Sequence, residues 1–183
     1  MNFYISDCHF GHKNVLIFDR RPWETVQEMN DAMVEKWNKK VSAKDTVYIL
    51  GDFIWNTNKD YFNLIKSLNG RKVLIRGNHD RVHSPEFKEL FDEITWYKTI
   101  KDNGYTVAMS HFFMPLYSGH LYDKHILLYG HSHNTGEHDF EMVLKEDMRK
   151  NNIPHESYNV GACHLNYEPC TLDEIMELWN NAK

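Results

Sequence analysis

The sequence predicts an α/β fold in which strands and helices form separate layers. Short β-rich runs alternate with longer stretches of helical period, and one pair of runs is joined by a hairpin turn at Asp102-Asn103-Gly104. A hairpin joins antiparallel strands, so the sheet structure is not expected to be purely parallel. No repeat, low-complexity stretch or linker interrupts the 183 residues, and we expect a single domain over residues 1–183.

Several short runs rich in β-branched and aromatic residues predict the strands. The six clearest are Phe3–Ile5, Thr46–Leu50, Lys72–Arg76, Thr106–Met109, His125–Tyr129 and Ser157–Val160. The hairpin adds Trp96–Ile100 before its turn.

Apolar residues spaced three and four apart predict four helices. They are Val26–Lys39, Lys59–Leu68, Asp139–Lys150 and Leu172–Asn180. Two of them begin with the spacing of a capping box, Thr25 with Glu28 and Thr171 with Glu174. The periodicity of the third helix predicts that its inward side chains are Phe140, Val143, Leu144 and Met148.

Composition limits the class of protein. With 42% apolar residues the chain can fill a core, and its formal net charge of −5 disfavours an extended nucleic-acid surface or an anionic membrane as partner. The longest apolar runs are four residues, far short of the ~20 that span a bilayer. The first residues do not resemble a signal peptide, and the three cysteines form no close pair, so we expect a cytoplasmic location.

Polar groups follow five predicted strands at their carboxyl ends, the edge where layered α/β folds bind ligands. The motifs are Asp7-Cys8-His9, Gly51-Asp52, Gly77-Asn78-His79-Asp80, Ser110-His111 and Gly130-His131-Ser132-His133. If the Asp-x-His and His-x-His segments are extended, alternate side chains share one side of each. We therefore expect both pairs to face a common ligand.

These motifs offer four imidazoles, two carboxylates and one amide. This nitrogen and oxygen set suits Mn²⁺, Fe²⁺, Zn²⁺, Co²⁺ or Ni²⁺ rather than Ca²⁺. Seven ligands exceed what one such ion takes, whereas two ions sharing a carboxylate would use them all. Two ions ~3.5–4 Å apart can activate a water and hold a phosphoryl oxygen.

The motifs, in the order D-x-H, G-D, G-N-H-D, H and G-H-x-H, resemble those of the calcineurin-like metallophosphoesterases. The resemblance runs from about residue 3 to residue 133 and continues more loosely to the end. It implies a four-layer αββα sandwich with mixed sheets. It also implies two divalent ions, of which Mn²⁺ is favoured and Fe, Zn, Ni and Co are alternatives.

The resemblance assigns a role to each motif residue. The first ion is expected on Asp7, His9 and His133. The second is expected on Asn78, His111 and His131, with Asp52 bridging both ions. A hydroxide between the ions is the implied nucleophile, and His79 is the implied catalytic residue that assists the leaving-group oxygen. Asp80 is the second catalytic candidate, as a group that orients or charge-stabilises the His79 imidazole.

Three neighbours of the motifs are candidate substrate-binding residues. His12 follows the first motif, and the residues that flank the third motif, Arg76 and Arg81, carry guanidinium groups suited to phosphate. The charged turn Asp19–Trp23 is interpreted as structural. The stretch Phe112–Tyr117 is interpreted as loop packing, with a wall for an aromatic leaving group as the alternative.

The function expected from this pattern is dinuclear-metal-dependent hydrolysis of a small phosphoester or nucleotide-like substrate, with diesters favoured. After Gly51-Asp52 the chain lacks the D-R-G run of the protein-phosphatase branch. Two alternatives are a phosphomonoesterase acting on a small molecule or nucleotide, and a metal-binding scaffold without turnover. The sequence leaves open the oligomeric state and whether Asp139–Lys150 covers the site.

Overall fold

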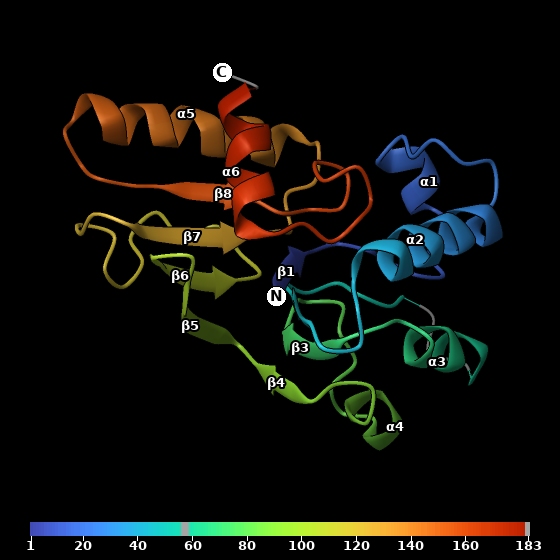
Figure 1. The fold of residues 1–183 in the computed structure, drawn as a ribbon. Helices are drawn as coiled ribbons and strands as arrows, with labels where there is room; N and C mark the ends of the chain where they lie inside the picture. The colour runs from blue at the N-terminus through green and yellow to red at the C-terminus, as the bar shows by residue number, and fades with distance from the viewer. Residues whose placement is uncertain (56–58, 182–183) are drawn as a thin grey trace.

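The computed structural model describes residues 1–55 and 59–181, which form two four-stranded sheets with helices on their outer sides (Figure 1). The first sheet is parallel throughout and contains β1 (Asn2–Ile5), β2 (Thr46–Ile49), β3 (Arg71–Ile75) and β4 (Glu93–Thr95). The second is mixed and contains β5 (Tyr97–Asp102), β6 (Tyr105–Ser110), β7 (His125–Tyr129) and β8 (Ser157–Asn159). The expected mixture of strand directions is therefore confined to the second sheet.

The helices are α1 (Val15–Phe18), α2 (Val26–Lys40), α3 (Lys59–Lys66), α4 (Pro85–Lys88), α5 (Gly136–Lys150) and α6 (Leu172–Asn181). Both expected capping boxes are confirmed. The Thr25 hydroxyl accepts a hydrogen bond from the Glu28 amide, and the Glu28 carboxylate accepts one from the Thr25 amide. The same reciprocal pair joins Thr171 and Glu174 at the start of α6.

Apolar side chains define the four layers. On the outer face of the first sheet, Phe3 and Ile49 pack with Trp37 of α2 and Phe87 of α4. Between the sheets, a second core is built from residues such as Tyr4, Val73, Met109 and Ile126. The helix α5 covers the outer face of the second sheet, so the αββα sandwich is confirmed (Figure 1).

The predicted inward face of α5 is partly wrong. Phe140 and Val143 are 67% and 65% exposed, whereas Met148 is buried as expected. The helix instead turns two polar side chains inward: Glu141 accepts a hydrogen bond from the Ser132 hydroxyl, and Lys145 donates one to the Tyr129 hydroxyl. These hydrogen bonds to buried hydroxyl groups, rather than the apolar periodicity, set which face of α5 lies against the sheet.

Three short elements were not predicted: α1, α4 and β4. The chain passes from one sheet to the other at Trp96, because β4 ends at Thr95 and β5 begins at Tyr97. The expected hairpin is confirmed, with φ of 45° at Asn103 and 81° at Gly104, the left-handed pair that a type I′ turn requires.

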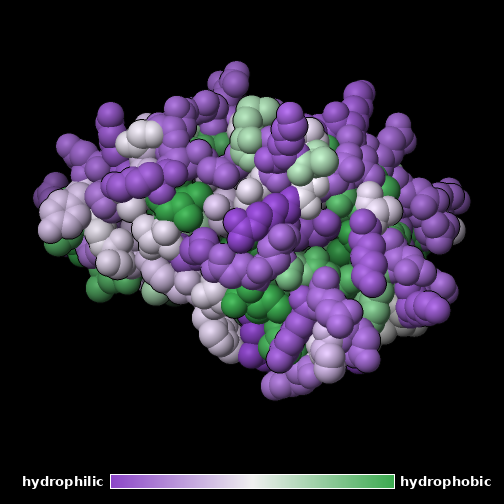
Figure 2. Space-filling model, turned by 60° about the horizontal axis from the view of Figure 1, so that its bottom comes forward, coloured by the Kyte–Doolittle hydropathy of each residue, from purple (hydrophilic) through white to green (hydrophobic). Residues whose placement is uncertain are grey.

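Figure 2 shows a face on which hydrophilic side chains predominate and apolar side chains form separate areas between them. Among residues 1–55 and 59–181, no helix has both the length and the apolar character needed to cross a membrane.

Candidate metal centre

The five motif loops meet where the carboxyl ends of β1, β2, β3, β6 and β7 come together. Backbone hydrogen bonds join them: Asp7 donates to Gly51 at 3.0 Å, and Gly130 donates to His111 at 2.9 Å. The Ser6 amide donates to Val160 at 2.8 Å, which links the two sheets beside the site. The five motifs predicted from the sequence therefore lie together at one edge of the sheets.

One group of ligand atoms comes from Asp7, His9 and His133. The Nε2 atoms of the two histidines lie 3.1 Å apart, and His133 Nε2 lies 3.7 Å from Asp7 Oδ1. Asp7 Oδ1 is buried and has no hydrogen-bond partner. A buried carboxylate oxygen without a donor, beside two ring nitrogens, fits a cation.

A second group contains Asp52, His111 and His131, with Asn78 beside it. His111 Nδ1 lies 2.7 Å from the Leu50 carbonyl and donates to it, so Nε2 of the neutral ring carries a lone pair. This atom lies 3.0 Å from Asn78 Oδ1 and 3.6 Å from Asp52 Oδ2. Three acceptors turned toward one another also fit a cation.

Asp52 lies between the two groups. Its Oδ2 is 3.9 Å from His9 Nε2 and 3.6 Å from His111 Nε2, while its Oδ1 accepts a hydrogen bond from the His79 amide. Burial, together with the negative charge of Asp7, raises the pKa of the Asp52 carboxyl. The position is the one that a bridging carboxylate would need.

Most of the candidate ligands have left-handed backbone conformations. The φ angles are 54° at Asp7, 51° at His9, 50° at Asp52, 72° at His131 and 46° at His133. The expectation of extended Asp-x-His and His-x-His segments is therefore wrong, although the side chains still converge. Such conformations cost on the order of 1–3 kcal/mol each in non-glycine residues and concentrate at functional sites.

Glycines allow the loops to approach this closely. A Cβ on Gly130 would collide with Ser6 and with the Asp7 carboxylate, and one on Gly77 would collide with Asp52. Gly51 has φ of 89° and lies against the His111 ring. The glycines of the motifs are thus required by the ligands of neighbouring loops.

The surroundings of two candidate ligands, His9 and His131, favour the neutral form of the imidazole. Burial and the neighbouring His133 lower the pKa of His9, and burial together with His111 lowers the pKa of His131. Neutral rings are the form that binds metal. For His133, burial lowers the pKa, but the stronger combined effect of Asp19 and Asp7 raises it.

Two buried side chains of the charged turn support the first group. Arg21 donates through Nη1 and Nη2 to the carbonyls of Cys8 and Asp7, both at 2.7 Å, and through Nε to Asp19 at 2.9 Å. Asp19 Oδ1 lies 3.4 Å from His133 Nδ1. Sequence reasoning assigned this turn a structural role but missed that it holds the ligand loop, because a local charge pattern does not reveal which segment it packs against.

The two predicted catalytic residues have different surroundings. The His79 side chain is 42% exposed, with Nε2 3.9 Å from Asp52 Oδ2. Asp80 is buried and accepts hydrogen bonds from the amides of Gly77, Asp52 and Phe53. Asp80 therefore ties the second and third motif loops together, and its expected effect on the His79 imidazole stays a prediction.

A cavity of about 340 Å³ opens over the two groups. His12 lines it and stacks on Trp55, with ring centroids 3.8 Å apart and planes at 8°. Phe18 forms another part of the wall. Sequence reasoning had selected His12 but missed Trp55 and Phe18, which carry no motif signal.

Arg76 and Arg81 do not reach this cavity. They line a second one of about 610 Å³, which shares Trp55 and His79 with the first. The candidate substrate-binding residues are therefore divided between two adjoining cavities.

The helix α5 borders the site without lying over it. Its first turn places Glu137 Oε2 3.6 Å from His131 Nε2, and the remainder runs along the second sheet (Figure 1). The exposed ring of Phe112 also lies beside His131, with the ring centroids 4.6 Å apart. This aromatic residue comes from the stretch that was interpreted as loop packing.

The fold and the two ligand groups define a metallophosphoesterase-like protein. The family model described as calcineurin-like phosphoesterase matches residues 3–164, and the chain belongs to this family. It is 34% identical to Uncharacterized protein MJ1445 of Methanocaldococcus jannaschii, over 99% of this chain and 92% of that protein. It is 28% identical to Gene 66 protein of Mycobacterium phage L5, over 82% of this chain and 83% of that protein.

A solved structure supports the same fold. The crystal structure of AQ665, a protein of unknown function from Aquifex aeolicus, matches with a TM-score of 0.75 and 30% identity. The match covers 97% of this chain and 98% of that chain. The architecture of the whole described chain therefore has a close counterpart.

Proposed function

We propose that the protein is a hydrolase that cleaves a phosphodiester with the help of two divalent metal ions. The observation that carries the proposal is the position of Asp52, whose Oδ2 lies between the two groups of ligand atoms and beside His79. Asp7, His9 and His133 would hold one ion, and Asn78, His111 and His131 the other. When bound, the ions supply positive charge for phosphoryl oxygens and make water more acidic.

His79 is the proton donor in the proposed reaction. The oxygen of a water molecule bonds to phosphorus while the ester bond on the opposite side breaks. The water releases a proton to solvent, and the leaving oxygen takes one from protonated His79, which solvent then restores. The exposed side chain at the boundary of both cavities can exchange protons with solvent and reach a leaving group.

The two adjoining cavities favour a diester over a monoester. A diester carries two organic groups on phosphorus, and space lies on both sides of the pair formed by Trp55 and His79. A monoester would use only one of these spaces. The proposed substrate is thus a small phosphodiester of nucleotide type.

We favour Mn²⁺ for the two sites, as the family resemblance implies. The donors are imidazole nitrogens and carboxylate and amide oxygens without thiolate, a set that also suits Fe²⁺, Zn²⁺, Co²⁺ and Ni²⁺. Metal analysis of the purified protein, followed by reloading of the stripped protein with Mn²⁺, Zn²⁺ or Co²⁺, tests this choice. The free cysteines Cys8, Cys163 and Cys170 support a reducing, cytoplasmic location.

The test of the function compares bis-p-nitrophenyl phosphate with p-nitrophenyl phosphate, using protein stripped of metal and reloaded with Mn²⁺. Diester cleavage that disappears in Asp52→Asn supports the proposal. Turnover of the monoester alone would instead identify a phosphomonoesterase. No turnover of either by the metal-loaded protein would favour the metal-binding scaffold.

A further inference from the structure

The second cavity, which we call the arginine cavity, is lined by Trp55, Arg76, Asn78, His79, Asp80, Arg81, His83 and Ser84. It lies next to the metal centre but contains none of the carboxylates that face the candidate ions. Asp80 contributes its only carboxylate, and this group already accepts three backbone hydrogen bonds. The cavity therefore carries an excess of positive charge.

The two guanidinium groups of this cavity are not neutralised. Among residues 1–55 and 59–181, neither Arg76 nor Arg81 forms an ion pair with a carboxylate. Arg76 Nε is buried and lacks a hydrogen-bond partner, while the guanidinium carbon lies 4.3 Å from the centroid of the Trp96 ring. Stacking holds this group in place and leaves its hydrogen-bond donors for a ligand.

We propose that the arginine cavity binds a second phosphoryl group of the substrate, carried by the part that departs when the scissile ester is cleaved. This inference rests on the proposed function and names the substrate class more closely: a phosphodiester whose leaving group is itself phosphorylated.

The assignment to the leaving group follows from His79. This residue lines both cavities, so a proton given to the leaving oxygen is delivered at their boundary. The departing fragment then extends past Trp55 into the arginine cavity. Two guanidinium groups and a nearby histidine suit a phosphoryl dianion, because each guanidinium can bind two of its oxygens.

The experiment compares three deoxyadenosine dinucleotides: one with only the internal phosphodiester, one with an added 5′ phosphate and one with an added 3′ phosphate. We expect kcat/KM for one of the two phosphorylated forms to exceed that of the unphosphorylated form by about tenfold, the size of one charge-assisted contact. Arg81→Met and Arg76→Met should reduce this ratio to about 2. A ratio near one for both forms in the unmodified protein would overturn the inference while leaving the diesterase intact.

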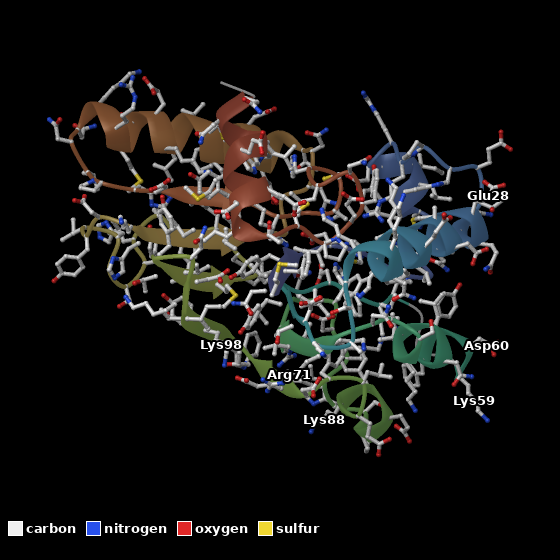
Figure 3. All side chains as sticks on the ribbon, viewed as in Figure 1. Glu28, Lys59, Asp60, Arg71, Lys88 and Lys98 are labelled. Atoms are coloured by element: carbon white, nitrogen blue, oxygen red, sulfur yellow. The ribbon has the colours of Figure 1, made fainter. Side chains whose placement is uncertain are left out.

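Arg71→Met is the matched control. Arg71 is the first residue of β3, the strand whose last residue, Ile75, precedes Arg76, and it lies 3.7 Å from Asp92 (Figure 3). This variant should keep the tenfold ratio. Because Arg76 packs on Trp96, its replacement can disturb the fold, so exposed Arg81 is the deciding position.

A binding measurement separates the two proposals. If no diester is cleaved, the proposed function fails, and calorimetric titration of the metal-free protein with inorganic pyrophosphate then tests the cavity alone. Binding that weakens about tenfold in Arg81→Met but not in Arg71→Met supports the inference. Equal binding by Arg81→Met and the unmodified protein would overturn it.

Discussion

Nδ1 of His133 lies 3.4 Å from Oδ1 of Asp19, on the side of the ring opposite the candidate metal ligands. Burial raises the pKa of Asp19, but the neighbouring His133 and the charge of Arg21 outweigh it and hold the pKa low. A carboxylate in this position fixes the orientation of a metal-binding imidazole and makes its other nitrogen a better ligand.

Asp19→Asn should therefore weaken metal binding at the Asp7, His9 and His133 group by roughly 10–100-fold. Titration of the stripped protein with Mn²⁺ against a chelating dye measures the change. Asp31→Asn, an exposed change on α2, is the control and should bind like the unmodified protein. Identical affinities for Asp19→Asn and the control would contradict the positioning role.

Asp52→Asn should lower the bound metal from two ions toward one per chain. The amide cannot supply the negative charge shared by the two groups. One nitrogen of each lies near the same oxygen, His9 Nε2 at 3.9 Å and His111 Nε2 at 3.6 Å. Hydrolysis should fall with the metal content. Elemental analysis of the dialysed variant measures the content, and a variant that retains both ions would show that Asp52 is not a bridge.

His79→Ala should lower kcat by about 10²–10⁴-fold, the usual contribution of a general acid. The loss should be largest for a dinucleotide, whose leaving group is an alkoxide, and smaller for bis-p-nitrophenyl phosphate, whose leaving group departs without a proton. Metal content should stay unchanged, because the His79 ring is not in either ligand group. Equal losses for the two substrates would argue against proton donation.

The sequence was sufficient to predict that the five motif loops meet, because each motif follows a buried strand and the carboxyl ends of those strands lie at one edge. The helices α1 and α4 gave no such signal, since four residues are too few to show a helical period. The three residues of β4 include a single apolar one, Ile94, so no β-rich run marks this strand. Asp19 and Arg21 were assigned to a turn, and only the folded chain places them under Asp7 and His133. The prediction of the inward face of α5 was partly wrong for the same reason. Ser132 and Tyr129, which lie outside the helix, form hydrogen bonds with its polar side chains.

The stability of the protein should depend on pH through His155. Burial, together with the charge of Lys145, lowers the pKa of His155 from its ordinary value near 6.5 to about 4. The unfolded chain therefore binds this proton more readily, so the contribution of His155 to stability is present above about pH 6.5 and is lost as the pH falls toward 4. In His155→Gln the decrease in melting temperature from pH 7 to pH 4.5 should be smaller than in the unmodified protein. Parallel pH profiles for the two proteins would contradict this assignment.

Gly130→Ala should damage both the fold and the metal centre. The added methyl group would collide with Ser6 and with the Asp7 carboxylate, and relieving such a collision costs about 1–3 kcal/mol. Because Asp7 also accepts a hydrogen bond from the His131 amide at 2.9 Å, movement of its carboxylate disturbs both ligand groups. Urea unfolding and Mn²⁺ titration should therefore both change.

Gly136→Ala is the matched control for this prediction. Gly136 begins α5, has open space where a Cβ would lie and does not have a positive φ. Alanine there should raise the free energy of unfolding by about 0.4–1 kcal/mol, chiefly by restricting the unfolded chain, and leave metal binding unchanged. If Gly130→Ala destabilises the protein and Gly136→Ala stabilises it, the loss at Gly130 comes from the close approach of two loops. If the two variants had the same free energy of unfolding and the same affinity for Mn²⁺, the close approach of the loops would not be the reason for a glycine at position 130.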